Sequence, residues 1–249
     1  MWQVVYDELK DKGIDFISVA LDAGGAAAVR PRIECPDLAE RPDAIRELMG
    51  WSEAAWGKMK APEYQCLIDA EHVVADLFHM YNVPQAVWID EQGNMVRPPE
   101  VAGFGDAFRS ADTETFVLDE EDRDKLSRNR RRYVDALGDW VENGADSYAV
   151  MSPEQVLEHL ELPSEDDVTA AAHARLGALC LERSDHAGAE RHFRAATALA
   201  PGKWNYRRQS MVVSEELIGE LNVAPEFWET LQAVGDGYYY KPIALPDME

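Results

Sequence analysis

The stretch of sequence that decides the fold is YNVPQAVWIDEQGNMV, residues 81–96. Its apolar run at 85–90 predicts a strand, and the turn-forming residues at 91–94 predict a tight hairpin turn. Residues 95–97 predict the return strand, which two consecutive prolines then end. The first strand is entered through the Val83–Pro84 bond. The stretch therefore predicts an antiparallel hairpin.

The segments before this hairpin alternate between helix and strand patterns. In chain order they predict a helix at 2–12, a strand at 14–21, a loop at 23–36, a helix at 37–60, a strand at 64–68 and a helix at 71–81. The first of these strands is almost continuously apolar, as is typical of a central parallel strand. This order predicts an α/β domain over residues 1–115.

Strand patterns stop after the irregular stretch 100–118, which is rich in Gly, Asp and Thr. A charged helical pattern runs from 119 to 142, and prolines separate the shorter helical patterns that follow. The tyrosines at 238–240 predict an extended tail that packs on a protein surface rather than a ligand site. We therefore expect an all-helical domain over residues 119–249.

Charge and composition exclude several classes of protein. The chain carries 47 acidic and 24 basic residues, a formal net charge of −23. Such a field repels nucleic acid and anionic membranes, so we expect neither as a partner. No apolar run approaches the about 20 residues of a membrane span, and the N-terminus lacks a signal-peptide pattern. As written, the sequence predicts a cytoplasmic protein, or an extracytoplasmic one if the true N-terminus lies upstream.

Signatures of cofactor and metal binding are missing from the sequence. It has no phosphate-binding loop, no dinucleotide fingerprint and no nucleophile-elbow serine. His and Cys clusters at metal-ligand spacing are also absent, and the six histidines show no consistent catalytic pairing. We therefore expect no cofactor and no metal site.

Residues 77–96 resemble the C-terminal half of thioredoxin-like proteins, especially the TlpA-like thiol–disulfide reductases and related redoxins. The resemblance rests on the order helix, cis-proline turn, strand, Asp-x-x-Gly hairpin and edge strand, and it covers roughly residues 1–112. It implies an N-terminally incomplete thioredoxin-like domain with Pro84 as the cis-proline. It also implies that Val83 and Pro84 bind substrate, with the backbone of Val83 pairing with the substrate chain.

The cysteines depart from the pattern of that family. The family carries its nucleophilic cysteine at the start of the helix that ends here at Gly13, and no Cys-x-x-Cys occurs in the 249 residues. Three readings stay open: a redox enzyme whose start is missing, a redox-inactive relative that binds through the groove beside Pro84, or use of another cysteine. Cys35 and Cys66 are the candidates for that last reading, although lone cysteines more often act as small buried apolar groups.

A second resemblance lies in the helical part. Residues 170–203 are similar to one tetratricopeptide repeat at positions Leu176, Gly177, Ala189, Phe193, Ala196 and Pro201. His173 and Cys180 depart from it, because Trp and Tyr are frequent there in the family. The pattern implies one helical hairpin, and the neighbouring segments do not repeat it. A single repeat cannot build a peptide-binding superhelix.

The sequence thus predicts a thioredoxin-like redoxin protein, related to thiol–disulfide oxidoreductases and either redox-inactive or truncated as given. If the chain is active, its chemistry is thiol–disulfide exchange. The alternative is a non-enzymatic interaction or adaptor subunit that uses the thioredoxin groove and the tetratricopeptide-like helices. A sheet that lacks its first strand leaves an unpaired edge, so we expect a protein partner or a homodimer contact to cover it.

Overall fold

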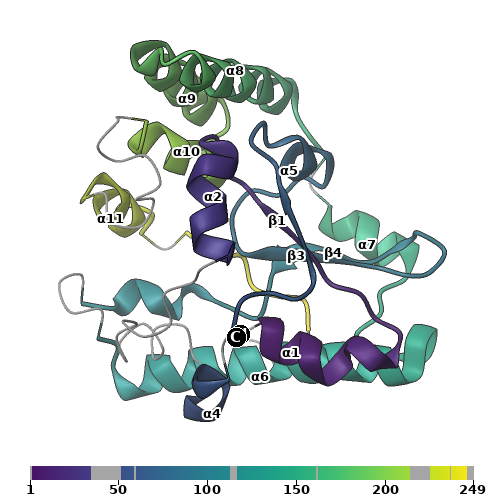
Figure 1. The fold of residues 1–249 in the computed structure, drawn as a ribbon. Coiled ribbons are helices and arrows are strands. Elements are labelled where there is room, and N and C mark those ends of the chain that lie inside the picture. The colour runs from purple at the N-terminus through teal and green to yellow at the C-terminus, as the bar shows by residue number, and fades with distance from the viewer. Residues whose placement is uncertain are drawn as a thin grey trace.

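The computed structural model describes residues 2–34, 52–58, 60–112, 117–160, 162–213, 225–235 and 237–245. Short strands lie in the first part of these ranges, and the rest of the described chain is helical (Figure 1). The structure is therefore mixed α/β, with a helix-rich C-terminal part. Among the helices of these ranges, none combines the length and the apolar character that crossing a lipid bilayer requires.

The first part contains α1 (Trp2–Leu9), η1 (Lys10–Lys12), β1 (Ile17–Ala20), α2 (Gly25–Glu34), α4 (Glu53–Gly57), β2 (Gln65–Ile68), α5 (Val73–Leu77), β3 (Gln85–Ile89), β4 (Met95–Val101) and η2 (Asp106–Ser110). The helical part contains α6 (Glu120–Asn143), η3 (Gly144–Asp146), α7 (Pro153–His159), α8 (Glu165–Glu182), α9 (His186–Leu199), α10 (Trp204–Met211) and α11 (Pro225–Gln232). The α elements are α-helices and the η elements are short 3-10 helices.

The strands form two separate two-stranded sheets. β1 and β2 run parallel, with Ile17 opposite Gln65 and Ala20 opposite Ile68. β3 and β4 run antiparallel, as the sequence predicts for the hairpin. Within the described residues each strand therefore pairs along one edge only.

The hairpin turn between β3 and β4 is held by Asp90. Its carboxylate accepts hydrogen bonds from the backbone N–H groups of Gln92 at 3.0 Å and Asn94 at 2.7 Å. Gly93 has a φ of +83°, a left-handed conformation that glycine adopts without steric cost. The hairpin turn predicted from Asp-x-x-Gly is thus confirmed.

The prediction that Pro98 and Pro99 end the return strand is wrong, because β4 continues to Val101. The pairing shows the reason. Arg97 lies opposite Trp88, and Glu100 lies opposite Ala86. Between these two pairs, Pro98 and Pro99 on β4 face the single residue Val87 on β3. The prolines form this bulge, where no ladder hydrogen bond needs their missing N–H groups.

The segment predicted as a loop at 23–36 contains α2 instead. Asp22 begins this helix, since its side chain accepts from the N–H of Gly24 at 2.8 Å and its carbonyl from that of Gly25 at 2.9 Å. Three consecutive alanines then favour the helical conformation. Of the helix predicted at 37–60, only α4 lies in the described residues, and 35–51 lie outside them.

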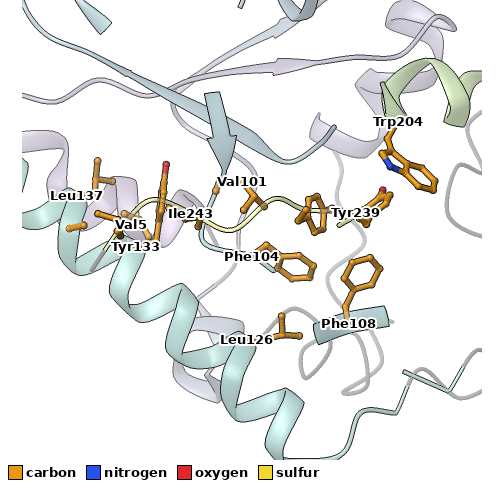
Figure 2. Packing of buried hydrophobic residues seen from close by; sticks show 14 of the residues in the cluster. Val5, Val101, Phe104, Phe108, Leu126, Tyr133, Leu137, Trp204, Tyr239 and Ile243 are labelled. Atoms are coloured by element: carbon orange, nitrogen blue, oxygen red, sulfur yellow. The ribbon is translucent and has the colours of Figure 1, made fainter. Parts of the chain in front are cut away.

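The larger hydrophobic core joins residues from both ends of the chain. It includes Val5 of α1, Tyr133 of α6 and Tyr239 of the C-terminal tail (Figure 2). Trp88 of β3 belongs to the same core. The indole N–H of Trp88 donates to the Tyr133 hydroxyl at 2.8 Å. Residues on both sides of the expected 115–119 boundary therefore share one core, and the boundary itself stays a prediction.

A second, smaller core lies in the helical hairpin of α8 and α9, far from α6 (Figure 1). Phe193 fills the space beside Gly177, where an added Cβ would lie 2.9 Å from the aromatic ring. Ala189 and Ala196 are fully buried in the same contact. α9 ends at Leu199, shortly before Pro201. The sequence predicted this two-helix hairpin and the small residues that let its helices approach.

A buried ion pair ties β4 to the helical part. Arg97 is 1% exposed and donates two hydrogen bonds to the Glu100 carboxylate, from Nε at 2.5 Å and from an Nη at 3.0 Å. It also donates to the carbonyls of Ala149 at 2.6 Å and Ala244 at 3.0 Å. One guanidinium thus connects β4, the segment after η3 and the C-terminal tail.

Removing the Glu100 carboxylate leaves the Arg97 charge buried without its anion. We expect Glu100→Ala to lower the free energy of unfolding by about 3–5 kcal/mol, the usual effect of breaking a buried pair. Urea denaturation measures it. The matched control is Glu190→Ala, which breaks an exposed pair with Arg194 and should cost less than about 1 kcal/mol. Equal losses in the two variants would contradict the role given to Arg97.

Candidate functional site

The candidate site lies at Val83 and Pro84, between α5 and β3. The Val83–Pro84 bond is cis, as the resemblance implied. The Asn82 side-chain oxygen accepts from the Val83 N–H at 2.8 Å. The Tyr240 hydroxyl donates to the Val83 carbonyl at 2.6 Å. Both backbone groups of the residue expected to pair with a substrate therefore already have partners within the chain.

The C-terminal tail reaches this site because Asp106 holds it. The Asp106 carboxylate accepts hydrogen bonds from two consecutive backbone N–H groups, those of Tyr239 at 2.8 Å and Tyr240 at 2.5 Å. The Asn82 side-chain amide donates to the Tyr239 carbonyl at 3.0 Å. The tail is thus fixed by hydrogen bonds on both sides. This agrees with the prediction that residues 238–240 pack on a protein surface.

Aromatic packing completes the attachment of the tail. The Tyr239 ring meets Trp204 edge-on with ring centroids 4.5 Å apart (Figure 2). The centroids of the Tyr240 and Phe104 rings lie 5.6 Å apart. Burial raises the pKa of Tyr240 well above its usual value. Its hydroxyl consequently stays protonated and remains a donor to Val83.

The backbone groups of the turn before the cis bond also form hydrogen bonds within the chain. The Gln85 side-chain oxygen accepts from the N–H groups of Tyr81 at 2.8 Å and Asn82 at 3.1 Å. The N–H of Asn205, in α10, donates to the Tyr81 carbonyl at 3.2 Å. α10 and the tail therefore cover this turn together.

A buried polar cluster, which the sequence did not reveal, lies where α5 meets α10. His72 is 4% exposed and stacks on the ring of Tyr206, with centroids 6.4 Å apart. Tyr206 donates a hydrogen bond from its hydroxyl to Asp76. Burial lowers the pKa of His72, and the nearby carboxylates of Asp69 and Asp76 oppose this only in part. His72 is thus a neutral imidazole inside the protein.

The cysteines of the described residues are separate from one another. Cys66 is a half-buried free thiol in β2, and its sulfur accepts from the Ser18 hydroxyl at 3.2 Å. Cys180 is a free thiol in α8. Cys35 lies outside the described residues, so a Cys35–Cys66 pair stays a prediction. Within the described part of the chain, no three His, Cys, Asp or Glu side chains converge as a metal-ligand set.

No family model matches the chain, and no curated protein sequence or solved structure matches it either. The site is therefore interpreted from its own contacts. Those contacts show a cis-proline turn that the rest of the chain covers.

The hydrogen bond from the Tyr240 hydroxyl to the Val83 carbonyl can be tested by removing that hydroxyl. We expect Tyr240→Phe to lower the free energy of unfolding by about 1 kcal/mol, since the Val83 carbonyl loses its donor. Limited proteolysis should also cut the tail faster. Tyr238→Phe is the control, because Tyr238 is 62% exposed and should change neither measurement. Indistinguishable behaviour of the two variants would contradict the hydrogen bond.

The buried His72 makes stability depend on pH. The folded state holds its pKa below the unfolded value of about 6.5, so the unfolded chain takes up a proton that the folded chain does not. Stability should therefore fall as the pH drops below about 6.5, by up to about 1.4 kcal/mol per pH unit for this one group.

Chemical denaturation between pH 7.5 and 5.5 checks this expectation. His72 has a φ of +59°, which asparagine tolerates, so His72→Asn should reduce the pH slope while keeping the backbone. His159→Asn is the control, because His159 is exposed and should leave the slope as in the wild type. An unchanged slope in His72→Asn would disprove the assignment.

Proposed function

We propose that this chain is a thioredoxin-like, redoxin-type protein that does not exchange disulfides and works through protein contacts. In this proposal, residues 1–115 form the thioredoxin-like domain and residues 119–249 the helical domain with its tetratricopeptide-like hairpin. The observation that carries it is that both backbone groups of Val83 are bonded within the chain: its N–H donates to the Asn82 side-chain oxygen, and its carbonyl accepts from the Tyr240 hydroxyl.

The argument from Val83 is one of occupied hydrogen-bonding groups. A redoxin substrate is expected to lie beside the cis-proline as an extended chain and to use the N–H and C=O of the residue before it. A strand that binds in this way gains its affinity from those backbone bonds. Here the chain's own side chains take both positions, so a substrate would have to displace them first.

The cysteines support the same proposal. Thiol–disulfide exchange by a redoxin needs an accessible thiolate next to its resolving cysteine. The sequence has no Cys-x-x-Cys. The Cys66 sulfur accepts a hydrogen bond from the Ser18 hydroxyl on the neighbouring strand. Neither Cys66 nor Cys180 has another cysteine within hydrogen-bonding or bonding distance among the described residues.

Exposed apolar side chains on the strands support the interaction role. Ile17 of β1 is 65% exposed, and Leu67 of β2 and Ile89 of β3 are each 44% exposed. They lie on short sheets whose other edges have no paired strand in the described residues. Apolar surface and open strand edges are both features that a partner chain covers. The expected partner is another protein or a second copy of this chain.

An insulin-reduction assay with dithiothreitol tests the proposal. The chain should not accelerate reduction above dithiothreitol alone, whereas a thioredoxin assayed in parallel does. Tyr240→Phe, which loosens the tail, should be equally inactive because no redox pair becomes available. Acceleration by the wild type that disappears in Cys66→Ser would show that Cys66 catalyses exchange and would refute the proposal.

A further inference from the structure

Two histidines of the helical hairpin meet at the contact between α8 and α9. The Nδ1 atoms of His173 and His192 lie 2.9 Å apart, and the ring centroids are 5.2 Å apart at an interplanar angle of 36°. Both side chains are partly exposed. They are separated by 19 residues in the sequence, so their meeting depends on how the two helices pack.

The packing brings the two rings together because the helix contact is made of small side chains. Ala170 and Ala174 of α8 and Ala189 and Ala196 of α9 are buried in it. Such residues let two helix backbones approach closely, so side chains at the edge of the contact reach across to one another. His173 and His192 occupy that edge, where water can reach them.

The two nitrogens present lone pairs to one small volume. When both rings are neutral, one Nδ1 carries a hydrogen and donates it, and the other accepts. When a cation binds, the ring that carried its hydrogen on Nδ1 gives up that proton and takes one on Nε2, so both rings stay neutral and both Nδ1 lone pairs can bind the cation.

The distance between these nitrogens suits a metal ion. Two imidazole nitrogens bound tetrahedrally at 2.0–2.1 Å lie about 3.3 Å apart. The observed separation is therefore only a few tenths of an ångström too short, and small rotations of two partly exposed rings can open it.

We propose that His173 and His192 form a two-histidine site for a divalent transition-metal ion of the Cu²⁺, Ni²⁺ and Zn²⁺ group. Neutral imidazole selects these ions over Mg²⁺ and Ca²⁺, which prefer oxygen ligands. The chain's net charge of −23 raises the local concentration of any dication. Because no third protein ligand converges among the described residues, water completes the coordination and leaves positions open for exchange.

Calorimetric titration of the full chain with Cu²⁺ at pH 7.5, in a buffer that does not chelate metals, tests the site. Cu²⁺ is the probe because it binds nitrogen ligands most tightly in this series. The wild type should bind one equivalent at this site. His173→Gln and His192→Gln should each weaken it at least about tenfold, since the remaining imidazole loses its chelating partner.

The control is His159→Gln, which removes an exposed histidine from α7 and should bind as the wild type does. Thermal melts without metal show whether each variant is folded. If a variant fails to fold, NMR of the wild type decides: substoichiometric Cu²⁺ should broaden the resonances of residues around 173 and 192 first. Absence of binding, unchanged binding in both folded variants, or broadening elsewhere would each overturn the proposal.

Discussion

The carboxylate of Asp106 binds two consecutive backbone N–H groups of the C-terminal tail, and much of the molecule depends on that contact. With the tail held there, Tyr240 reaches the Val83 carbonyl and the Ala244 carbonyl reaches Arg97. The rings of Tyr239 and Tyr240 also belong to the larger core. Figure 2 shows the Tyr239 ring beside Trp204. A single acidic side chain in a short 3-10 helix thus allows residues more than 100 positions apart to share one hydrophobic core.

α10 connects the two cores of the molecule. Trp204 belongs to the larger core, and Tyr206, two residues later, belongs to the core of the helical hairpin. The hydrogen bond from Tyr206 to Asp76 joins α10 to α5 as well. The buried His72 lies against this same ring, so its neutral state depends on α10 being in place.

The sequence predicted the β3–β4 turn and the α8–α9 hairpin but missed α2 and the contacts between distant residues. The β3–β4 turn depends on Asp90 and Gly93, which lie within four residues of each other, and the α8–α9 contact depends on small residues at fixed spacing. The Pro98–Pro99 bulge was missed because a bulge is defined by the opposite strand. The contact between Asn82 and Tyr239 spans 157 residues, and no periodicity encodes it. The burial of His72 and the meeting of His173 with His192 likewise depend on packing between separate elements.

Because the tail covers the backbone of Val83, an outside ligand must compete with the tail for this position. A segment attached to the same chain is present at an effective concentration set by its tether, not by the amount of protein in solution. An extended chain from another molecule would pair with the Val83 backbone only in the fraction of molecules whose tail is detached. If that fraction were about 1%, the apparent affinity would fall about a hundredfold. The aromatic tail therefore competes with any outside ligand for the backbone of Val83. Only a ligand whose affinity is high enough to displace the tail would bind there.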